Sequence, residues 1–386
     1  MPLKDVLLAP GPSQVPERVR FVLAEQSWYH RSARFKNVYK ECRERLARIF
    51  ETSKSDVLLF AGSGTASMEA SIVNAIPKGR KALVVSGGKW GERLVSICKA
   101  FEIPCEVIKI EYGGVPSPSQ IGDALKKDPS IAAVYVHLCE TSTGAKFDVK
   151  GIGAVVKQTE ALLAVDAISG AVGMECPIDA WGIDFFMAGS QKGLMMPPGL
   201  AVLTVSPKAW KIVDTVAAPA YYLSLKQCKK ALAENDTPFT PANTLIAAQN
   251  EALKMIEEEG AKNVLARHAA LAEATRAATN ALGLEQFPKV PSEVLTVVKS
   301  PAGLDGSAVI KAAKNRYGVT LADGQGDMKG KVIRIAHMGY CSGMDSLVGI
   351  AALELGLKAC GANVTLGKGV AAAQEVLAKV PKEVTL

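Results

Sequence analysis

Short apolar segments recur along the first two hundred residues, and polar or turn-forming residues bound each of them. Uniformly apolar segments of this length are typical of strands that are buried on both faces of a sheet. Most of them are separated by segments with helical periodicity, such as Met68, Ile72 and Ile76. This alternation predicts an α/β domain with a mostly parallel, helix-covered sheet. The seven predicted strands are residues 56–60, 82–86, 105–110, 131–137, 161–165, 183–187 and 200–205.

The pattern changes after about residue 245. A long helical stretch is broken near Gly260 and ends at Gly283, and two strand candidates (293–298 and 331–336) and one more helix (346–361) follow. This order predicts a smaller C-terminal α+β domain. The predicted parts are an N-terminal segment associated with the small domain (1–15), a large domain (16–250) and a small domain (251–386).

Composition excludes two classes of protein. The chain has 386 residues, of which 48% are hydrophobic, so it can bury a sizeable core and is not disordered. Its net charge is +7, but Lys and Arg are scattered among Asp and Glu, and no basic run is interleaved with aromatic residues. We therefore expect no nucleic-acid partner, while the mild positive excess suits anionic small molecules.

Cysteine and histidine usage argues against a metal site. The eight cysteines form no CxxC pair and mostly fall in apolar segments, and there are only four histidines. Buried free thiols indicate a reducing compartment. The N-terminus lacks the long apolar core of a signal peptide, no stretch of about 18 apolar residues occurs, and the C-terminus is not the peroxisomal tripeptide. A cytoplasmic protein without a membrane partner is the expectation.

Lys192 lies in the most informative stretch of the chain. The apolar strand 183–187 leads through small and polar residues to this lysine, and MMPPG then stiffens the turn. A lysine held between buried strands is poorly hydrated, which lowers its pKa toward the neutral amine. A neutral amine can attack a carbonyl and form a Schiff base. A solvated lysine in a β-turn is the alternative interpretation.

Asp166 follows another buried strand, 161–165, and small residues come after it. The carboxyl ends of strands are where open α/β sheets bind ligands. Pyridoxal phosphate (PLP) needs a lysine together with an acidic group that keeps its pyridinium nitrogen protonated. Lys192 and Asp166, at the ends of successive strands, match this need, although an aspartate here can also be a helix cap or a turn former.

A phosphate site is predicted at Ser63, Gly64 and Thr65, between strand 56–60 and the next helix. Glycine lets the backbone approach a ligand, and a helix N-terminus presents free N–H groups and a positive dipole. The lysine of a P-loop is absent and GxGxxG does not fit. An ordinary N-cap with a glycine turn is the alternative.

Motifs along nearly the whole chain carry a family resemblance. In order they are LLAPGPSQVP, YHRSARF, FAGSGTASMEA, GGKWGERL, HLCETSTGA, VDAISGAVG, GSQKGLMMPPG, TPFTPANTL and RIAHMGYCS. The chain resembles the class V aminotransferases, in their alanine–glyoxylate and serine–glyoxylate (serine–pyruvate) branch. The resemblance implies the α/β PLP-dependent transferase fold type I, with a large domain that holds a mostly parallel seven-stranded sheet and a smaller C-terminal α+β domain.

The resemblance also implies roles for residues of the cofactor site. Lys192 would carry the cofactor and act as the base that moves the substrate proton, with Gln191 beside it. Trp90 would stack on the pyridine ring, and Thr141 would contact the side of the phenolic oxygen. Packing in the core is the alternative for Trp90, and a turn or cap is the alternative for Thr141.

Arg334 lies in an apolar strand, where an arginine is costly unless it is paired. By resemblance it binds the α-carboxylate of the amino acid; an arginine that points to solvent from an edge strand is the alternative. Thr240, in TPFTP, matches a threonine that reaches across a subunit interface to the phosphate. This match implies a homodimer with active sites at the interface.

The expected reaction moves an amino group from alanine or serine to glyoxylate or pyruvate, without a metal. One alternative is a broad-specificity aspartate aminotransferase, in which Arg31 or Arg34 binds the second carboxylate. A ureidoglycine–glyoxylate enzyme and a non-catalytic hydrogenase-associated relative are others, but the retained Lys192, Asp166 and Arg334 argue against the last. A cysteine desulfurase needs a reactive cysteine on a mobile loop, and the surroundings of Cys341 do not match one.

Overall fold

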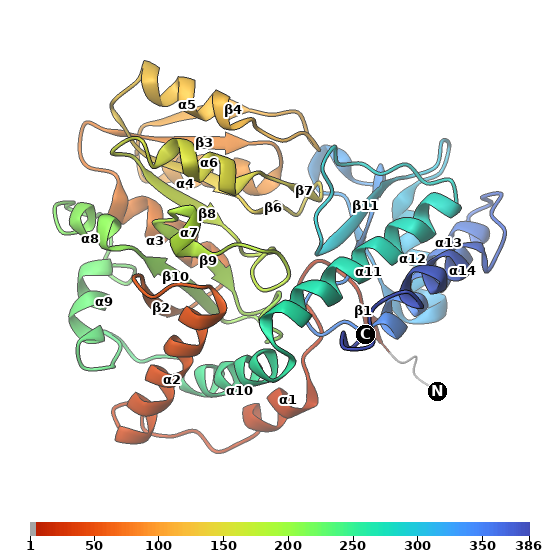
Figure 1. Cartoon of the computed structure of the whole chain (residues 1–386), viewed down its shortest axis with the longest axis horizontal. Helices are drawn as coiled ribbons and strands as arrows, with labels where there is room; N and C mark the ends of the chain where they lie inside the picture. Colours follow the sequence, from red (N-terminus) through yellow and green to blue (C-terminus); the bar gives the residue numbers. More distant parts are fainter. Residues whose placement is uncertain (1–4) are drawn as a thin grey trace.

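The seven predicted strands form one sheet in the computed structural model, which describes residues 5–386 (Figure 1). Neighbouring strands run parallel except where β10 pairs with β2 and β9. The predicted α/β class and the mostly parallel sheet are therefore confirmed. In sheet order the strands are β2 (Asp56–Ala61), β10 (Leu200–Val205), β9 (Phe185–Gly189), β8 (Leu162–Asp166), β5 (Ile131–His137), β3 (Lys81–Ser86) and β4 (Cys105–Lys109).

The central strands β5, β8, β9 and β10 are mostly apolar because both faces of the sheet are buried there, whereas the edge strand β4 is only half-buried. Leu163 and Val165 of β8 pack into one core layer, whereas Leu162 and Ala164 pack into the other. Helices and one small hairpin surround this sheet (Figure 1). They are α1 (Glu17–Leu23), α2 (Ala33–Ile49), α3 (Gly64–Ala75), α4 (Lys89–Ala100), α5 (Pro118–Lys127), α6 (Val149–Val156), α7 (Ile178–Trp181), α8 (Pro207–Val213), α9 (Leu225–Leu232) and α10 (Asn243–Glu259), with the hairpin β6 (Cys139–Glu140) and β7 (Ala145–Lys146).

The C-terminal part contains an antiparallel sheet of three strands in the order β11-β14-β13. Arg334 lies on β14, the middle strand, so the edge-strand alternative is wrong. The two-residue strand β13 was too short to predict. The elements are α11 (Ala261–Ala281), β11 (Leu295–Lys299), α12 (Gly306–Tyr317), β12 (Val319–Thr320), β13 (Ala322–Asp323), a 3₁₀ turn (Gly326–Met328), β14 (Val332–Ala336), α13 (Gly343–Ala359) and α14 (Lys368–Leu377).

The N-terminal segment packs on the C-terminal part. Strand β1 (Val6–Leu7) pairs in parallel with β12, and Leu8 joins the C-terminal core. The backbone N–H of Ala336 donates to the carbonyl of Leu8 at 2.7 Å. Residues 1–4 of the predicted segment 1–15 lie outside the described residues.

The long predicted helix is divided at Gly260, whose φ of 85° ends α10 and starts α11. Figure 1 shows α11 running from the large sheet region to the C-terminal part. Position 250 lies inside α10, and the boundaries 16–250 and 251–386 stay a prediction.

One strand is displaced from its expected position. We expect residues 183–187, but β9 spans Phe185–Gly189. Asp184 is buried and its carboxylate accepts hydrogen bonds from Leu163 N and Ser206 Oγ, so it ties the turn before the strand to two neighbours. Within residues 5–386, no helix is both long and apolar enough to cross a membrane.

Candidate active site

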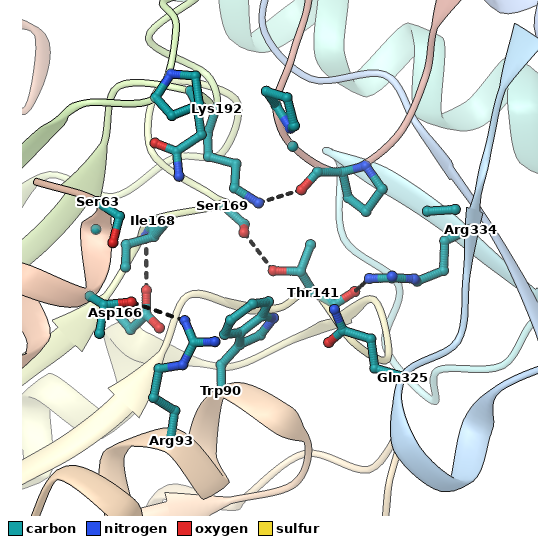
Figure 2. Close-up of a pocket in the computed structure, with 18 residues that line it drawn as sticks. Ser63, Trp90, Arg93, Thr141, Asp166, Ile168, Ser169, Lys192, Gln325 and Arg334 are labelled. Atoms are coloured by element: carbon teal, nitrogen blue, oxygen red, sulfur yellow. Dashed lines mark hydrogen bonds between the residues drawn. The ribbon is translucent and has the colours of Figure 1, made fainter.

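A cavity of about 290 Å³ lies between the carboxyl ends of the parallel strands and the C-terminal part. Figure 2 shows its lining side chains pointing toward one another from both parts of the chain. The lining includes these predicted residues: Ser63, Gly64, Thr65, Trp90, Thr141, Asp166, Gln191, Lys192 and Arg334. The same lining contains residues that the sequence analysis missed, among them Pro10, Gly11, Arg93, Ser169 and Gln325.

Lys192 follows β9 and is only 8% exposed. Its Nζ donates a hydrogen bond to the carbonyl of Pro10, which brings the N-terminal segment onto the lysine. Gly11 has a φ of 113°, and a Cβ there would collide with the end of the Lys192 side chain. Ser13 completes the contact, because its hydroxyl donates to the Lys192 carbonyl at 2.8 Å. The glycine is therefore needed for close approach.

Burial lowers the pKa of Lys192 to about 8. The charge of Asp166 raises this pKa and that of Arg334 lowers it, but both effects are smaller than that of burial. Lys192 is thus much closer to the neutral amine at physiological pH than an ordinary lysine. The interpretation as a solvated surface lysine is wrong.

Asp166 is the last residue of β8, rather than the first residue after the strand, and it is 5% exposed. One of its carboxylate oxygens accepts a hydrogen bond from Ile168 N at 2.9 Å. Neighbouring strand β9 leads to Lys192, so adjacent strands bring the two charged groups to the same edge of the sheet. The carboxyl-end arrangement predicted for the pair is what the fold contains.

The first turn of α3 lies at the same edge. Its N-cap, Ser63, makes no side-chain cap hydrogen bond, so its hydroxyl is available to a ligand. Gly64 packs against Ile168, and a Cβ at Gly64 would lie 2.7 Å from Ile168 Cδ1. Free N–H groups at the start of a helix favour an anion there.

Trp90 lies in the first turn of α4, and the buried carboxylate of Glu140 holds that turn in place. Glu140 Oε2 accepts hydrogen bonds from the backbone N–H groups of Trp90 at 3.1 Å and Gly91 at 3.2 Å. Its Oε1 accepts from the Ser142 hydroxyl at 2.6 Å. A Cβ at Gly88 would collide with Glu140, so glycine is required before the helix. Glu140 therefore fixes the aromatic ring relative to the segment that carries Thr141.

Two hydroxyls face each other in the middle of the cavity. Thr141 and Ser169 are both buried and are joined by a short hydrogen bond (Figure 2). Ser169 follows Asp166 by three residues in the VDAISG motif, and that small-residue run was its only signal in the sequence.

Arg334 enters the cavity from the C-terminal part and is 6% exposed. Its Nε donates to the Asp323 carbonyl at 2.8 Å, and its Nη1 donates to the Thr141 carbonyl at 3.1 Å. Burial lowers the pKa of Arg334 to about 10, so the guanidinium remains charged at neutral pH. Gln325 lies beside it in Figure 2. The two carbonyls accept hydrogen bonds but do not neutralise the positive charge of Arg334. No carboxylate in residues 5–386 forms an ion pair with it.

The remaining candidates lie outside the cavity lining. Thr240 is exposed on the surface of the single chain. Arg31 forms an ion pair with Asp236 at 2.6 Å, and Arg34 lies over the ring of Trp28. Within one chain, neither arginine is placed to bind a substrate in this cavity. In the described part of the chain, no group of three His, Cys, Asp or Glu side chains is placed to hold a metal ion.

Most of the site residues that the sequence did not predict share one property. Glu140 lies in the two-residue strand β6, Arg93 on a helix surface and Gln325 in a loop, and in none of these places does the sequence offer an apolar pattern against which the residue stands out. Gly11 carried a weak signal, since a glycine between two prolines indicates a constrained backbone.

Comparisons with known proteins agree with this geometry. Residues 7–326 match the family model described as aminotransferase class-V. The chain is 35% identical to a serine–glyoxylate aminotransferase of Methylorubrum extorquens and 32% identical to an L-aspartate–glyoxylate aminotransferase of Paracoccus denitrificans. It is 39% identical to a protein of Anabaena cylindrica named soluble hydrogenase 42 kDa subunit. These matches cover 97–98% of this chain and 96–98% of the relatives.

A solved structure is similar over the same length. The crystal structure of ureidoglycine–glyoxylate aminotransferase from Bacillus subtilis superposes with a TM-score of 0.93 at 29% identity. The match covers 98% of this chain and 99% of that one.

The cavity fits PLP, the cofactor that these matches imply. It offers an amine, a carboxylate and a hydroxyl-bearing helix start, which are the groups that PLP recognition requires. Two buried polar atoms in the lining, Trp90 Nε1 and Gln191 Oε1, have no hydrogen-bond partner among residues 5–386. Unpartnered buried polar atoms call for a ligand or water.

Proposed function

Because this chain belongs to the class V aminotransferases, we propose that it moves the amino group of alanine or serine to glyoxylate or pyruvate. One observation carries the proposal: the cavity brings together a lysine of lowered pKa, an acidic strand end and one arginine aimed from the opposite part of the chain. Bound PLP supplies a carbonyl carbon for the amine and a pyridinium ring that accepts electrons from the substrate carbon.

We propose the following roles for the chain's own groups. The neutral Nζ of Lys192 accepts the proton of the substrate Cα and releases it again. The charge of Asp166 favours a protonated ring nitrogen. The guanidinium of Arg334 binds the α-carboxylate and so aligns the Cα–H bond. Trp90 covers the ring and excludes water, while Thr141, Gln191 and the Ser63–Thr65 turn hold the cofactor.

The positions of Arg31 and Arg34 support the preference for small donors; Arg93 is the one further cation that lines the cavity besides Arg334 and Lys192 among residues 5–386. An aspartate donor needs a second cation for its side-chain carboxylate, and the only two candidates that the sequence suggested, Arg31 and Arg34, lie outside the cavity of the single chain. The existence of an L-aspartate–glyoxylate relative keeps the aspartate reaction as the second candidate. The hydrogenase-associated reading is disfavoured by the intact Lys192, Asp166 and Arg334.

We also propose a homodimer in the cytoplasm. Thr240 is exposed, and the nearby Tyr221 and Tyr222 rings are 76% and 44% exposed, which supports burial of this surface against a second copy. The eight cysteines are all free, which supports a reducing compartment. Sedimentation of the purified protein tests the dimer, and a monomer at micromolar concentration would contradict it.

A matrix of donors and acceptors tests the reaction. Alanine, serine, aspartate and glutamate are each assayed with glyoxylate, pyruvate and 2-oxoglutarate, and the specificity constants are compared. We expect alanine or serine with glyoxylate or pyruvate to give the largest values. A preference for aspartate with 2-oxoglutarate would select the aspartate alternative. Turnover with none of the pairs by a PLP-loaded protein would favour the non-catalytic reading.

Arg31 provides a finer comparison within the same matrix. Under the proposal, Arg31→Ala leaves the ratio of the aspartate and alanine specificity constants unchanged. Under the aspartate alternative, that ratio falls by about an order of magnitude or more, because a carboxylate loses its charged partner.

A further inference from the structure

Arg93 lies on α4 one helical turn after Trp90 and lines the cavity. Its guanidinium carbon is 4.3 Å from the centre of the Trp90 ring. Its Nη1 donates a hydrogen bond to the hydroxyl of Thr65 at 3.0 Å. Figure 2 shows the side chain extended along the Trp90 ring on the side of the cavity where Asp166 lies. Arg93 therefore joins α4 to the first turn of α3.

No carboxylate in residues 5–386 forms an ion pair with Arg93, and only one of its five donors is used within that part. The adjacent acid, Glu92, is committed elsewhere. Its carboxylate accepts from Lys89 Nζ at 2.6 Å and from the Tyr112 hydroxyl. Hydrogen bonds from Lys89 and then Tyr112 hold the pKa of Glu92 below its usual range. The positive charge of Arg93 is therefore available to an external anion.

Arg93 is exposed, and like Arg43, Arg80 and Arg316 it forms no ion pair within residues 5–386, whereas other arginines are paired. Arg267 forms an ion pair with Glu259 at 2.7 Å, and Arg18 contacts both Glu251 and Glu258. Arg334, the other arginine of the cavity, uses two donors on backbone carbonyls. Two arginines line the cavity, and Arg93 has more unused hydrogen-bond donors than Arg334.

Three kinds of anion-binding group meet at this point. They are the Ser63 hydroxyl, which makes no cap hydrogen bond, the first turn of α3 and the Arg93 guanidinium beside Thr65. A planar guanidinium next to a helix N-terminus suits a tetrahedral oxyanion with several acceptor oxygens. We propose that Arg93 binds the phosphate of PLP directly, an assignment that rests on the proposed function.

A carboxylate is the other source of an oxyanion, in the form of the side chain of a dicarboxylic donor. The contact with Thr65 favours the phosphate, because it places the Arg93 charge at the helix start and not beside Arg334, which takes the substrate carboxylate. Stacking on Trp90 adds a second effect: the guanidinium lies over the face of the Trp90 ring and so holds the orientation of that ring.

Binding of PLP and of pyridoxal, the same molecule without phosphate, to the apoprotein tests the assignment. Both are titrated by tryptophan fluorescence in the wild type, Arg93→Gln and Arg93→Lys. We expect Arg93→Gln to weaken PLP by roughly 10- to 100-fold, as expected for loss of a hydrogen bond to a charged group, and pyridoxal by less than about threefold. Arg93→Lys should recover part of the loss for PLP. Inorganic phosphate should compete with pyridoxal phosphate less well in Arg93→Gln.

A matched control is Arg316→Gln. Arg316 also lies over an aromatic ring, that of Tyr317 at 5.7 Å, but on the surface of α12 and away from the cavity. It should leave both affinities unchanged. Equal weakening of PLP and pyridoxal by Arg93→Gln would overturn the assignment and make Arg93 a support of Trp90 only. Unchanged PLP binding with a selective loss of aspartate turnover would instead place a carboxylate at Arg93.

Failure of the proposed function gives a different result. If the wild type binds PLP far more tightly than pyridoxal but transaminates no donor, the proposed reaction is wrong and the affinities still decide the role of Arg93. If the wild type does not distinguish PLP from pyridoxal, no phosphate site exists and the assignment of Arg93 is overturned.

Discussion

The two walls of the cavity are built from different kinds of structure. The sheet wall, made of Thr141, Asp166 and Lys192, comes from the carboxyl ends of parallel strands whose cores are buried on both faces. The arginine wall, made of Gln325 and Arg334, comes from a three-stranded sheet and the loop beside it. Under the proposed function, rigid strand ends suit proton transfer, which tolerates little displacement, whereas the second wall need only recognise a carboxylate.

Inside the cavity, a hydrogen bond of Arg334 connects the two walls. Arg334 donates to Asp323 on its own side and to Thr141 on the other, and both acceptors are backbone carbonyls. A carboxylate is a stronger acceptor than a carbonyl for a guanidinium. The contact with Thr141 is thus one that a substrate can replace. We therefore expect variants of the sheet wall to affect chemistry and variants of the arginine wall to affect substrate binding.

Lys192→Ala should have the largest effect. Under the proposed function, removal of the amine eliminates both the attachment point of the cofactor and the base, so turnover should fall by at least about 10⁴-fold. Borohydride treatment should no longer fix the cofactor to the chain, while circular dichroism should report an intact fold. Lys208→Ala is the control, because Lys208 donates to backbone carbonyls far from the cavity lining. A Lys192→Ala protein that kept both the borohydride-reducible cofactor linkage and full turnover would contradict the role assigned to Lys192.

Asp166→Asn should have the second-largest effect on turnover. The substitution keeps the size of the side chain and removes the charge that favours a protonated ring nitrogen. We expect the cofactor-saturated enzyme to lose several kcal/mol of transition-state stabilisation, so that its turnover falls by at least about a hundredfold. Steady-state kinetics at saturating PLP provide the measurement. If only PLP affinity changed, Asp166 would be a structural cap and the pairing with Lys192 would be wrong.

Arg334→Ala sharpens the comparison from the opposite wall. Every donor carries an α-carboxylate, so the specificity constants of alanine, serine and aspartate should fall together by about 2–5 kcal/mol. PLP affinity of the apoprotein should stay near that of the wild type, and Arg334→Lys should retain part of the activity. A loss confined to one donor would show that Arg334 recognises a side chain instead.

The smallest effect concerns pH. Because burial lowers the pKa of Lys192 to about 8, the amine of the apoprotein is mostly protonated below that pH and mostly neutral above it. The rate of PLP attachment should rise about tenfold per pH unit below pH 8 and level off above it. Stopped-flow mixing of apoprotein with PLP measures this rate. A rise that continues unchanged to pH 10 would indicate an ordinary, solvated lysine.

The sequence predicted most of the sheet wall because its signals are local. Apolar strands that end in Asp166 and approach Lys192 stand out in a linear pattern, and so does the glycine-rich start of α3. The fold class was predictable for the same reason. The boundaries of β9 were shifted by two residues because Asp184, a turn residue fixed by distant partners, cannot be distinguished from a strand residue by pattern alone.

Other parts of the site depend on contacts between residues far apart in the chain. The hydrogen bond of Lys192 to Pro10 joins residues 182 positions apart, and that of Arg334 to Thr141 joins residues 193 positions apart. Glu140 and Arg93 gain their roles in the same way, through Trp90 and Thr65. The periodicity of hydrophobic residues in the sequence contains no information about which distant residues form such hydrogen bonds.

By itself, therefore, the sequence determined which segments are buried and which chemical groups follow the buried strands. Hydrophobic burial depends on composition and spacing, which a linear pattern contains. Only the tertiary structure decided the environment of those groups. The lowered pKa of Lys192 arises from desolvation, and the burial of Glu140 and the contact of Arg93 with Thr65 arise from neighbours that folding brings together.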